Sequence, residues 1–451
     1  MSIETAGGWL IPLGIALTFA SLPPTLPSGL PLLRAAARVF GLVLTACIAS
    51  AAAFAVHSVL WPGSGDMLTR MLQIGGFASA AGVAAGFGCA NPRGAVRAIA
   101  SATGAFAGAI LMPSLQDGWL MQLGALANLG HGAVDLSGLA LVGLVGGGCA
   151  TACNIVFRST AATPVLPNRS PVFAALDSLL LAFGAVTVVA SLPDARSSGV
   201  LTAHLASLSL IVSSALGFAM FYSWFTTGRL QATMLGRALV AALFAGSSAA
   251  VFPILSAPVL GIAAAVLAIP IGYWLQTRNG IRDGQGAASA VLLPAALGMV
   301  WTGLFANGRF LAGWGGVGAD AYLNHSGLGV VGWLAGGDIG QFSAQMVLIS
   351  AAAGLAMLAC AGGLIALQQI APALTLELDP TSQQLDVRRP RAKPGQQAFD
   401  NNEPSHSLPT GRAYRVAYPF RTRAKRAAQQ PRETPTFVVA DDTDSALSQD
   451  S

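Results

Sequence analysis

The sequence predicts an all-α polytopic membrane protein with eleven transmembrane helices. Hydrophobic residues account for 54% of its 451 residues and charged residues for only 10%, whereas a soluble domain carries roughly 25% charged residues. The mean hydropathy is +0.63. This composition excludes a soluble enzyme, and we expect no cofactor and no nucleic-acid partner.

Apolar stretches that could cross a bilayer recur along the chain. A helix of about 20 residues spans the hydrocarbon core, which is roughly 30 Å thick. The eleven predicted spans are residues 9–22, 39–60, 71–90, 98–113, 132–157, 171–192, 200–225, 236–254, 257–276, 286–306 and 343–370. The 53 glycines suit helices that approach each other closely in lipid.

The tenth span, residues 286–306, has two features of a helix that lines a passage. It carries no charge, and it contains Pro294. A proline inside a membrane helix is tolerated where neighbouring groups satisfy the carbonyl that it leaves unpaired. We therefore expect this helix to be packed inside the protein rather than to act as a simple anchor.

The arginines between the spans predict the orientation, because cytoplasmic loops carry an excess of basic residues. One alternate set of loops holds ten arginines, and the other holds two or three. The first set is Arg34, Arg38, Arg93, Arg97, Arg158, Arg169, Arg229, Arg237, Arg278 and Arg282, and the second is Arg196 and Arg309, with Arg70 near a helix start. The N-terminus is therefore expected outside and the C-terminus in the cytoplasm.

The spans divide into two sets of five, which predicts a five-plus-five inverted repeat with the eleventh helix as an addition. Residues 1–373 would then form the membrane domain. Residues 374–451 have low apolar content and no periodicity, so we expect a disordered cytoplasmic tail. Its basic part, residues 412–426, could rest on anionic headgroups or be a solvated linker.

Ionisable residues inside the membrane are functional candidates, because a charge is costly to bury there. Asp135, in GHGAVDLSG, could cap the fifth helix or support a substrate site. Cys149 and Cys153 lie four residues apart on one helix face. We interpret them as small packing residues rather than as metal ligands, and the five cysteines imply no disulfide framework. No phosphate-binding GxxxxGK[ST] loop is present, which excludes ATP-driven transport by this chain.

Four stretches, in order, resemble segments of the ammonium transporter family (the Amt, Mep and Rh type), and the resemblance covers residues 9 to 370. They are WLMQLGALANLGHGAVDLSG at 119–138, GRLQATMLGRALVAALFAG at 228–246, RDGQGAASAVLLPAALGMVWTGLFANG at 282–308, and GWGGVG at 313 followed by LAGGDIGQFSAQ at 334. The resemblance implies a homotrimer in which each subunit encloses a narrow apolar pore. It also implies an outer ammonium site, a gate of two Phe rings and two facing pore histidines.

The family's functional positions carry over one at a time. Asp135 matches the Asp that supports the outer site, Phe77 matches one gate residue, and the second gate position falls at Val188. The two pore histidines fall at Gly143 and Val291, so neither imidazole is present. We therefore predict Asp135 and Phe77 as substrate-binding residues and Gly143, Val291 and Val188 as pore-lining residues.

The leading hypothesis is a membrane channel or transporter, not an enzyme, that moves ammonium, ammonia or a small near-neutral solute. The alternative is a non-conducting, sensor- or scaffold-like descendant, which the missing imidazoles and the tail suggest. A third hypothesis is an unrelated secondary transporter, which the four ordered segments oppose. The tail has no segment that resembles the family's contact with its regulatory protein, so we do not expect that partner. The simplest location is a bacterial inner (plasma) membrane.

Overall fold

The computed structural model describes residues 44–49, 51–52, 67–89, 94–114, 132–156, 171–190, 199–278, 283, 286–310 and 330–370. The elements within these ranges are helices, which confirms the predicted all-α class. They are α3 (Met67–Gly88), α4 (Gly94–Ser114), α5 (Leu139–Val156), α6 (Pro171–Ala190), α7 (Val200–Thr227), α8 (Ala232–Ala245), η2 (Ala249–Val251), α9 (Ala257–Val266), η3 (Leu267–Ile271), α10 (Gly272–Arg278), η4 (Ala287–Leu292), α11 (Leu293–Phe305), η6 (Trp333–Ala335) and α12 (Ile339–Ile370).

Helices are present at the nine predicted spans from 71–90 onward. Five helical stretches in the described part of the chain are long and apolar enough to cross a membrane. Two predicted ends were wrong, because α5 begins only at Leu139 and α8 ends already at Ala245. The first predicted span, 9–22, and the predicted tail, 374–451, lie outside the described residues.

Both differences arise where two polar turns bind each other. The Ser137 amide donates to the Ser247 carbonyl at 3.2 Å, and the Ser248 hydroxyl donates to the Val134 carbonyl at 3.1 Å. Each turn thus satisfies buried backbone groups of the other. Continued helices could not do this, because their backbone groups would be bonded within the helix.

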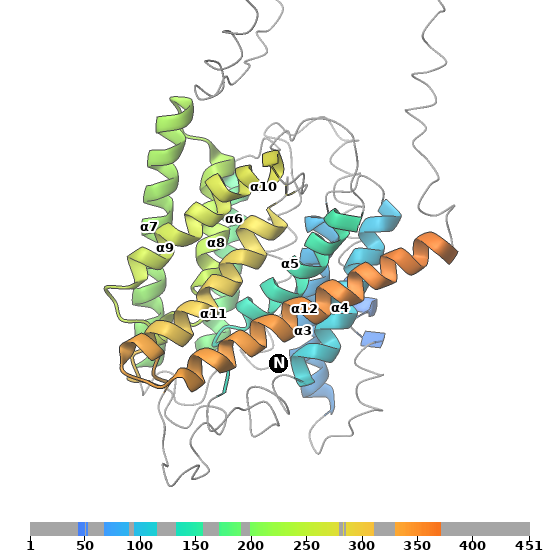
Figure 1. Ribbon diagram of the computed structural model, residues 1–451, viewed down its shortest axis with the longest axis horizontal. Helices are drawn as coiled ribbons and strands as arrows, with labels where there is room; N and C mark the ends of the chain where they lie inside the picture. The colour runs from blue at the N-terminus through green and yellow to red at the C-terminus, as the bar shows by residue number, and fades with distance from the viewer. Residues whose placement is uncertain are drawn as a thin grey trace, which may run out of the picture. The chain divides into compact units, whose positions relative to one another are not determined.

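Helix α5 lies at the centre of the packing. It is buried without interruption from Leu139 to Asn154, and it packs against α3, α4, α11, α12 and η4. Figure 1 shows the long α12, in orange, crossing α5 and α4. A helix surrounded on all sides requires small or apolar residues throughout, which explains why α5 has no polar face.

Helix α5 runs antiparallel to the η4–α11 segment. A Cβ added at Gly143 would lie 2.8 Å from Ala295 Cβ, and one added at Gly147 would lie 3.0 Å from Leu292 Cβ. The partner number falls as the α5 number rises, so the two segments point in opposite directions. Glycines on α5 permit this close approach, as in other membrane helix pairs.

The starts of these two segments repeat one pattern. Asp135 and Asp283 are each followed three residues later by a glycine with positive φ, Gly138 at 71° and Gly286 at 81°. Glycine adopts this conformation without steric cost. Because the two segments are antiparallel, the repeated Asp residues lie at opposite ends of the pair, which is the relation that an inverted repeat requires.

The cysteines differ from the prediction in one respect. Cys89, directly after α3, and Cys153 on α5 form a disulfide, with their Cα atoms 5.9 Å apart. The interpretation of Cys153 as a packing residue, without disulfides, was therefore wrong. Cys149 does pack: its thiol donates to the Ala356 carbonyl of α12 at 3.4 Å. The two residues differ because they reach different neighbouring helices.

Candidate functional site

The site is built around Asp135, in the extended segment that precedes α5. The Leu141 amide donates to Asp135 Oδ2 at 2.8 Å, and Asp135 is only 6% exposed. The predicted capping role is therefore confirmed. The first amides of a helix have no partner within the helix, so a buried carboxylate at this position satisfies them and favours the helix dipole.

Two glutamines of α12 hold the same segment from the other side. Gln341 Nε2 donates to the Gly132 carbonyl at 2.9 Å, and Gln345 Nε2 donates to the Val134 carbonyl at 3.5 Å. Both side chains are buried. Sequence reasoning missed them, although two amides spaced i, i+4 on an apolar helix mark one polar face that could have been recognised. The glutamines make Asp135 part of a fixed polar cluster.

Burial raises the pKa of Asp135 to about 6, against the lowering effect of the Leu141 and Ala140 amides and the Ser247 hydroxyl. Asp135 precedes the membrane-spanning helix and lies outside it. The carboxylate lies beside Ser247, but its Oδ1 has no hydrogen bond of good geometry within the described residues. At neutral pH the cluster therefore holds a buried negative oxygen with unused capacity to accept a hydrogen bond.

Phe77 of α3 lies next to this segment. A Cβ added at Gly138 would be 2.9 Å from Phe77 Cζ, and the Phe77 ring is almost fully buried. The structure thus brings together the two predicted substrate-binding residues, Asp135 and Phe77, through the turn that contains Gly138. A larger residue at this turn would displace the ring.

The predicted pore-lining residues lie on two different surfaces. Gly143 faces Ala295, one helical turn from Val291, so Gly143 and Val291 are on facing segments. Val188 lies on α6, which packs against α8 and α7. Val291 is 0% exposed and Val188 is 6% exposed. Their pore-lining role stays a prediction.

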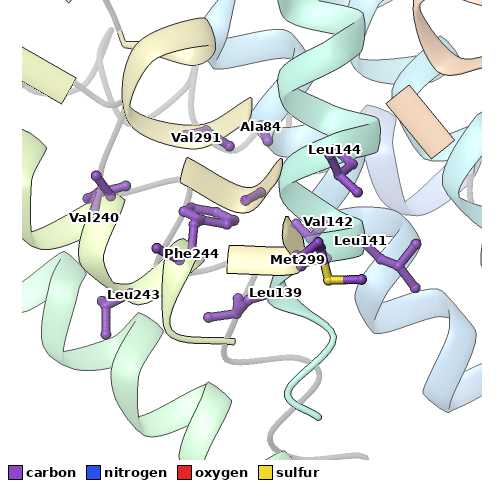
Figure 2. Packing of buried hydrophobic residues seen from close by; sticks show 14 of the residues in the cluster. Ala84, Leu139, Leu141, Val142, Leu144, Val240, Leu243, Phe244, Val291 and Met299 are labelled. Carbon is purple, nitrogen blue, oxygen red and sulfur yellow. The ribbon is translucent and has the colours of Figure 1, made fainter. Parts of the chain in front are cut away.

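Phe244 of α8 occupies the space beside Gly143, and sequence reasoning missed it. A Cβ added at Gly143 would lie 2.8 Å from Phe244 Cδ1. Figure 2 shows the Phe244 ring between its own helix and the helix that carries Val142 and Leu144. The sequence gives little indication of this position, because a lone Phe in an apolar helix is usually a core residue.

A second polar cluster forms at the start of η4. The carboxylate of Asp283 accepts from the amides of Ala288 at 2.8 Å and Ser289 at 2.9 Å. Arg237 and Gln276 donate to the Asp283 carbonyl at 3.1 and 2.8 Å. Burial raises the pKa of Asp283, and the Arg237 charge and these amides oppose the rise.

This cluster corrects the placement of Arg237. The sequence assigned it to a loop, but it lies inside α8, beside a buried carboxylate. Asp283 itself was missed. The Asp-x-x-Gly spacing shared with Asp135 could have indicated it, since Gly143 and Val291 each follow one of these Asp residues by eight positions.

Comparisons with known proteins agree with this architecture. The model of the Ammonium Transporter Family matches residues 104–389. None of the curated proteins compared matches the sequence.

Solved structures show the same fold. Candida albicans Mep2 is 16% identical, with a TM-score of 0.58 over 84% of this chain and 85% of that chain. Saccharomyces cerevisiae Mep2 is 16% identical, with a TM-score of 0.60 over 82% and 86%. A protein described as a sensor Amt protein is 18% identical, with a TM-score of 0.61 over 84% and 96%.

Proposed function

Because the chain belongs to the ammonium transporter family, we propose that it is a membrane transporter that moves ammonium, ammonia or another small near-neutral solute. Proteins of this family are transporters and not enzymes. The observation that supports this substrate class is the buried Asp135 carboxylate, whose Oδ1 has no hydrogen bond within the described residues. A small cation with N–H donors could donate a hydrogen bond to that oxygen and would need little space to do so.

The family also supports a homotrimer in the plasma membrane, with an outside N-terminus and a cytoplasmic C-terminus. In this arrangement the Asp135 end of α5 faces outside and the Asp283 end of η4 faces the cytoplasm. Asp135 and Phe77 would then form the outer site, and Gly143 and Val291 would line the middle of the passage. Residues 374–451 would be a tail outside the membrane domain.

A second candidate function is a non-conducting sensor or scaffold. It is favoured by the packing around Gly143, where Phe244 fills the space beside the glycine. The similarity in fold to a protein described as a sensor Amt protein is consistent with it. In this case the outer site would bind a solute and the tail would transmit the signal.

Transport predicts that the chain restores growth on limiting ammonium to a host that lacks its own ammonium transporters. A variant without residues 374–451 should restore growth equally well, because the passage lies in the membrane domain. Absence of rescue, with both chains present in the membrane, would count against conduction. If the full chain captures a cytoplasmic protein that the truncated chain does not, the sensor function gains support.

Asp135→Asn is expected to weaken ammonium binding about tenfold at pH 7.5, which is roughly 1.4 kcal/mol. The variant keeps the shape of the side chain and loses its charge. Because the pKa of Asp135 is about 6, the wild-type carboxylate is protonated at pH 5, and the two proteins should then bind ammonium alike. The measurement is the rise in melting temperature with ammonium chloride, with sodium chloride as control.

The direction of the pH effect on folding separates binding from unfolding. The pKa of Asp135 is higher in the folded chain, about 6, than its ordinary value of 3.8. Protonation therefore favours the folded state, and this group's contribution to stability falls as the pH rises from 4 to 6. Weaker ammonium binding at pH 5 cannot then be due to unfolding at Asp135. An equal affinity difference at both pH values would exclude a role for the charge.

A further inference from the structure

We propose that the Phe244 ring closes the passage at the centre of the membrane domain and determines how much solute crosses. This inference rests on the proposed transport function, because it names the residue that limits transport. Phe244 belongs to neither of the two polar clusters, and the closure is argued from its packing.

The geometry beside Gly143 carries the proposal. A Cβ at this position would be 2.8 Å from Phe244 Cδ1 and 3.2 Å from Cε1. Carbon atoms in contact are usually 3.5–4.0 Å apart. The ring therefore fills the volume into which any side chain at position 143 would project. The ring of Phe244 thus occupies space that is free only because Gly143 has no side chain.

The described residues around the ring are closed to water-sized molecules. Phe244 is 1% exposed, and Val291 and Ala295 on the segment facing Gly143 are 0% exposed. Figure 2 shows the ring between α8, which carries it, and α5, which carries Val142 and Leu144. A solute as small as ammonia would need accessible surface on the walls of its path. The path is therefore closed at this level while the ring is in this position.

Phe244 is also placed to respond to the polar cluster at Asp135. It precedes the last residue of α8, and the turn after this helix contains Ser247, whose hydroxyl lies beside the Asp135 carboxylate. The Ser247 carbonyl accepts from the Ser137 amide in the same segment. A solute that displaces this turn would act on the last turn of α8, which carries the ring.

Phe244→Ala tests the closure directly. Uptake of labelled methylammonium is measured in cells without other ammonium transporters, and amounts in the membrane are matched. We expect uptake at least about tenfold above that of the wild-type chain, the equivalent of roughly 1.4 kcal/mol. The control is Leu243→Ala, because Leu243 is also 1% exposed on the same helix but points away from Phe244. It should leave uptake at the wild-type level.

The outcomes separate this inference from the proposed function. If the wild-type chain takes up methylammonium and Phe244→Ala changes this uptake by less than twofold, the proposed closure is wrong and the proposed transport stands. If the wild-type chain shows no uptake but the Phe244→Ala variant does, the closure is supported and transport by the native protein is refuted. If neither conducts, both are refuted.

A second measurement covers the case in which Phe244→Ala does not fold. Phe244→Leu and Phe244→Val remove less volume, and uptake should rise in the order Phe, Leu, Val. In addition, Gly143→Ala should lower the melting temperature of Phe244→Leu less than that of the wild-type chain. The added methyl group would meet both the Phe244 ring and Ala295 Cβ, and only the ring contact is removed in Phe244→Leu. Equal effects of Gly143→Ala in both backgrounds would show that the ring does not fill this space.

Discussion

Asp283→Ala is expected to lower the free energy of unfolding by about 3–5 kcal/mol, the range for removing one member of a buried charge pair. The carboxylate accepts hydrogen bonds from the Ala288 and Ser289 amides and interacts with the Arg237 charge. Without it, the amides lose their acceptor and the arginine loses its nearest compensating charge. The measurement is the melting temperature of the purified protein in detergent, where we expect a loss of about 5–10 °C.

The matched control is Asp338→Ala. Asp338 Oδ1 accepts from the Gly340 amide at 2.8 Å, so the same kind of bond is broken, but this residue is exposed. Water can replace an exposed bond, and we expect a loss of about 1 kcal/mol or less. Similar losses for the two variants would mean that burial of Asp283 contributes little.

Gly298→Ala is expected to destabilise the protein by about 3 kcal/mol, at the upper end for added volume in a packed core. Helices α8 and α11 touch through their backbones at this glycine. A Cβ there would be 2.9 Å from Ala245 Cα and closer still to its carbonyl oxygen. Backbone cannot yield as a flexible side chain can, so α11 would have to move away from α8.

Gly354→Ala on α12 is the control, because a Cβ there has no atom within 4 Å. Both variants replace a helical glycine by alanine, and this replacement by itself stabilises a helix by about 1 kcal/mol. The difference between the two melting temperatures therefore isolates the helix contact. An unchanged or raised melting temperature in Gly298→Ala would contradict the close approach of α8 and α11.

The helices of this fold could be predicted from the sequence, and some of their ends could not. Long uncharged stretches indicate membrane helices because an unpaired backbone group in lipid is costly. The start of α5 and the end of α8 were missed because they depend on hydrogen bonds between Ser137 and Ser247, which are 110 positions apart. Local sequence contains no information on such a pair.

The candidate site was predicted in part. Asp135 stood out because a carboxylate in an apolar stretch is rare, and its capping role is confirmed. Gln341 donates a buried hydrogen bond and Asp283 accepts two, but each lies near the end of a helix, where polar residues are common. Arg237 was counted among the loop arginines because it lies at the very start of the predicted span 236–254, whereas α8 begins earlier, at Ala232.

The sequence alone determined the class of this protein: its apolar composition requires a membrane, and its ordered motifs place it in the ammonium transporter family. Only the tertiary structure decided what stands where the two imidazoles are missing. Gly143 by itself suggests an empty space, and the structure shows the Phe244 ring in it. Composition and local pattern decide whether a segment lies in the membrane or in water. The packing beside Gly143 depends instead on side chains that helices distant in the sequence bring together.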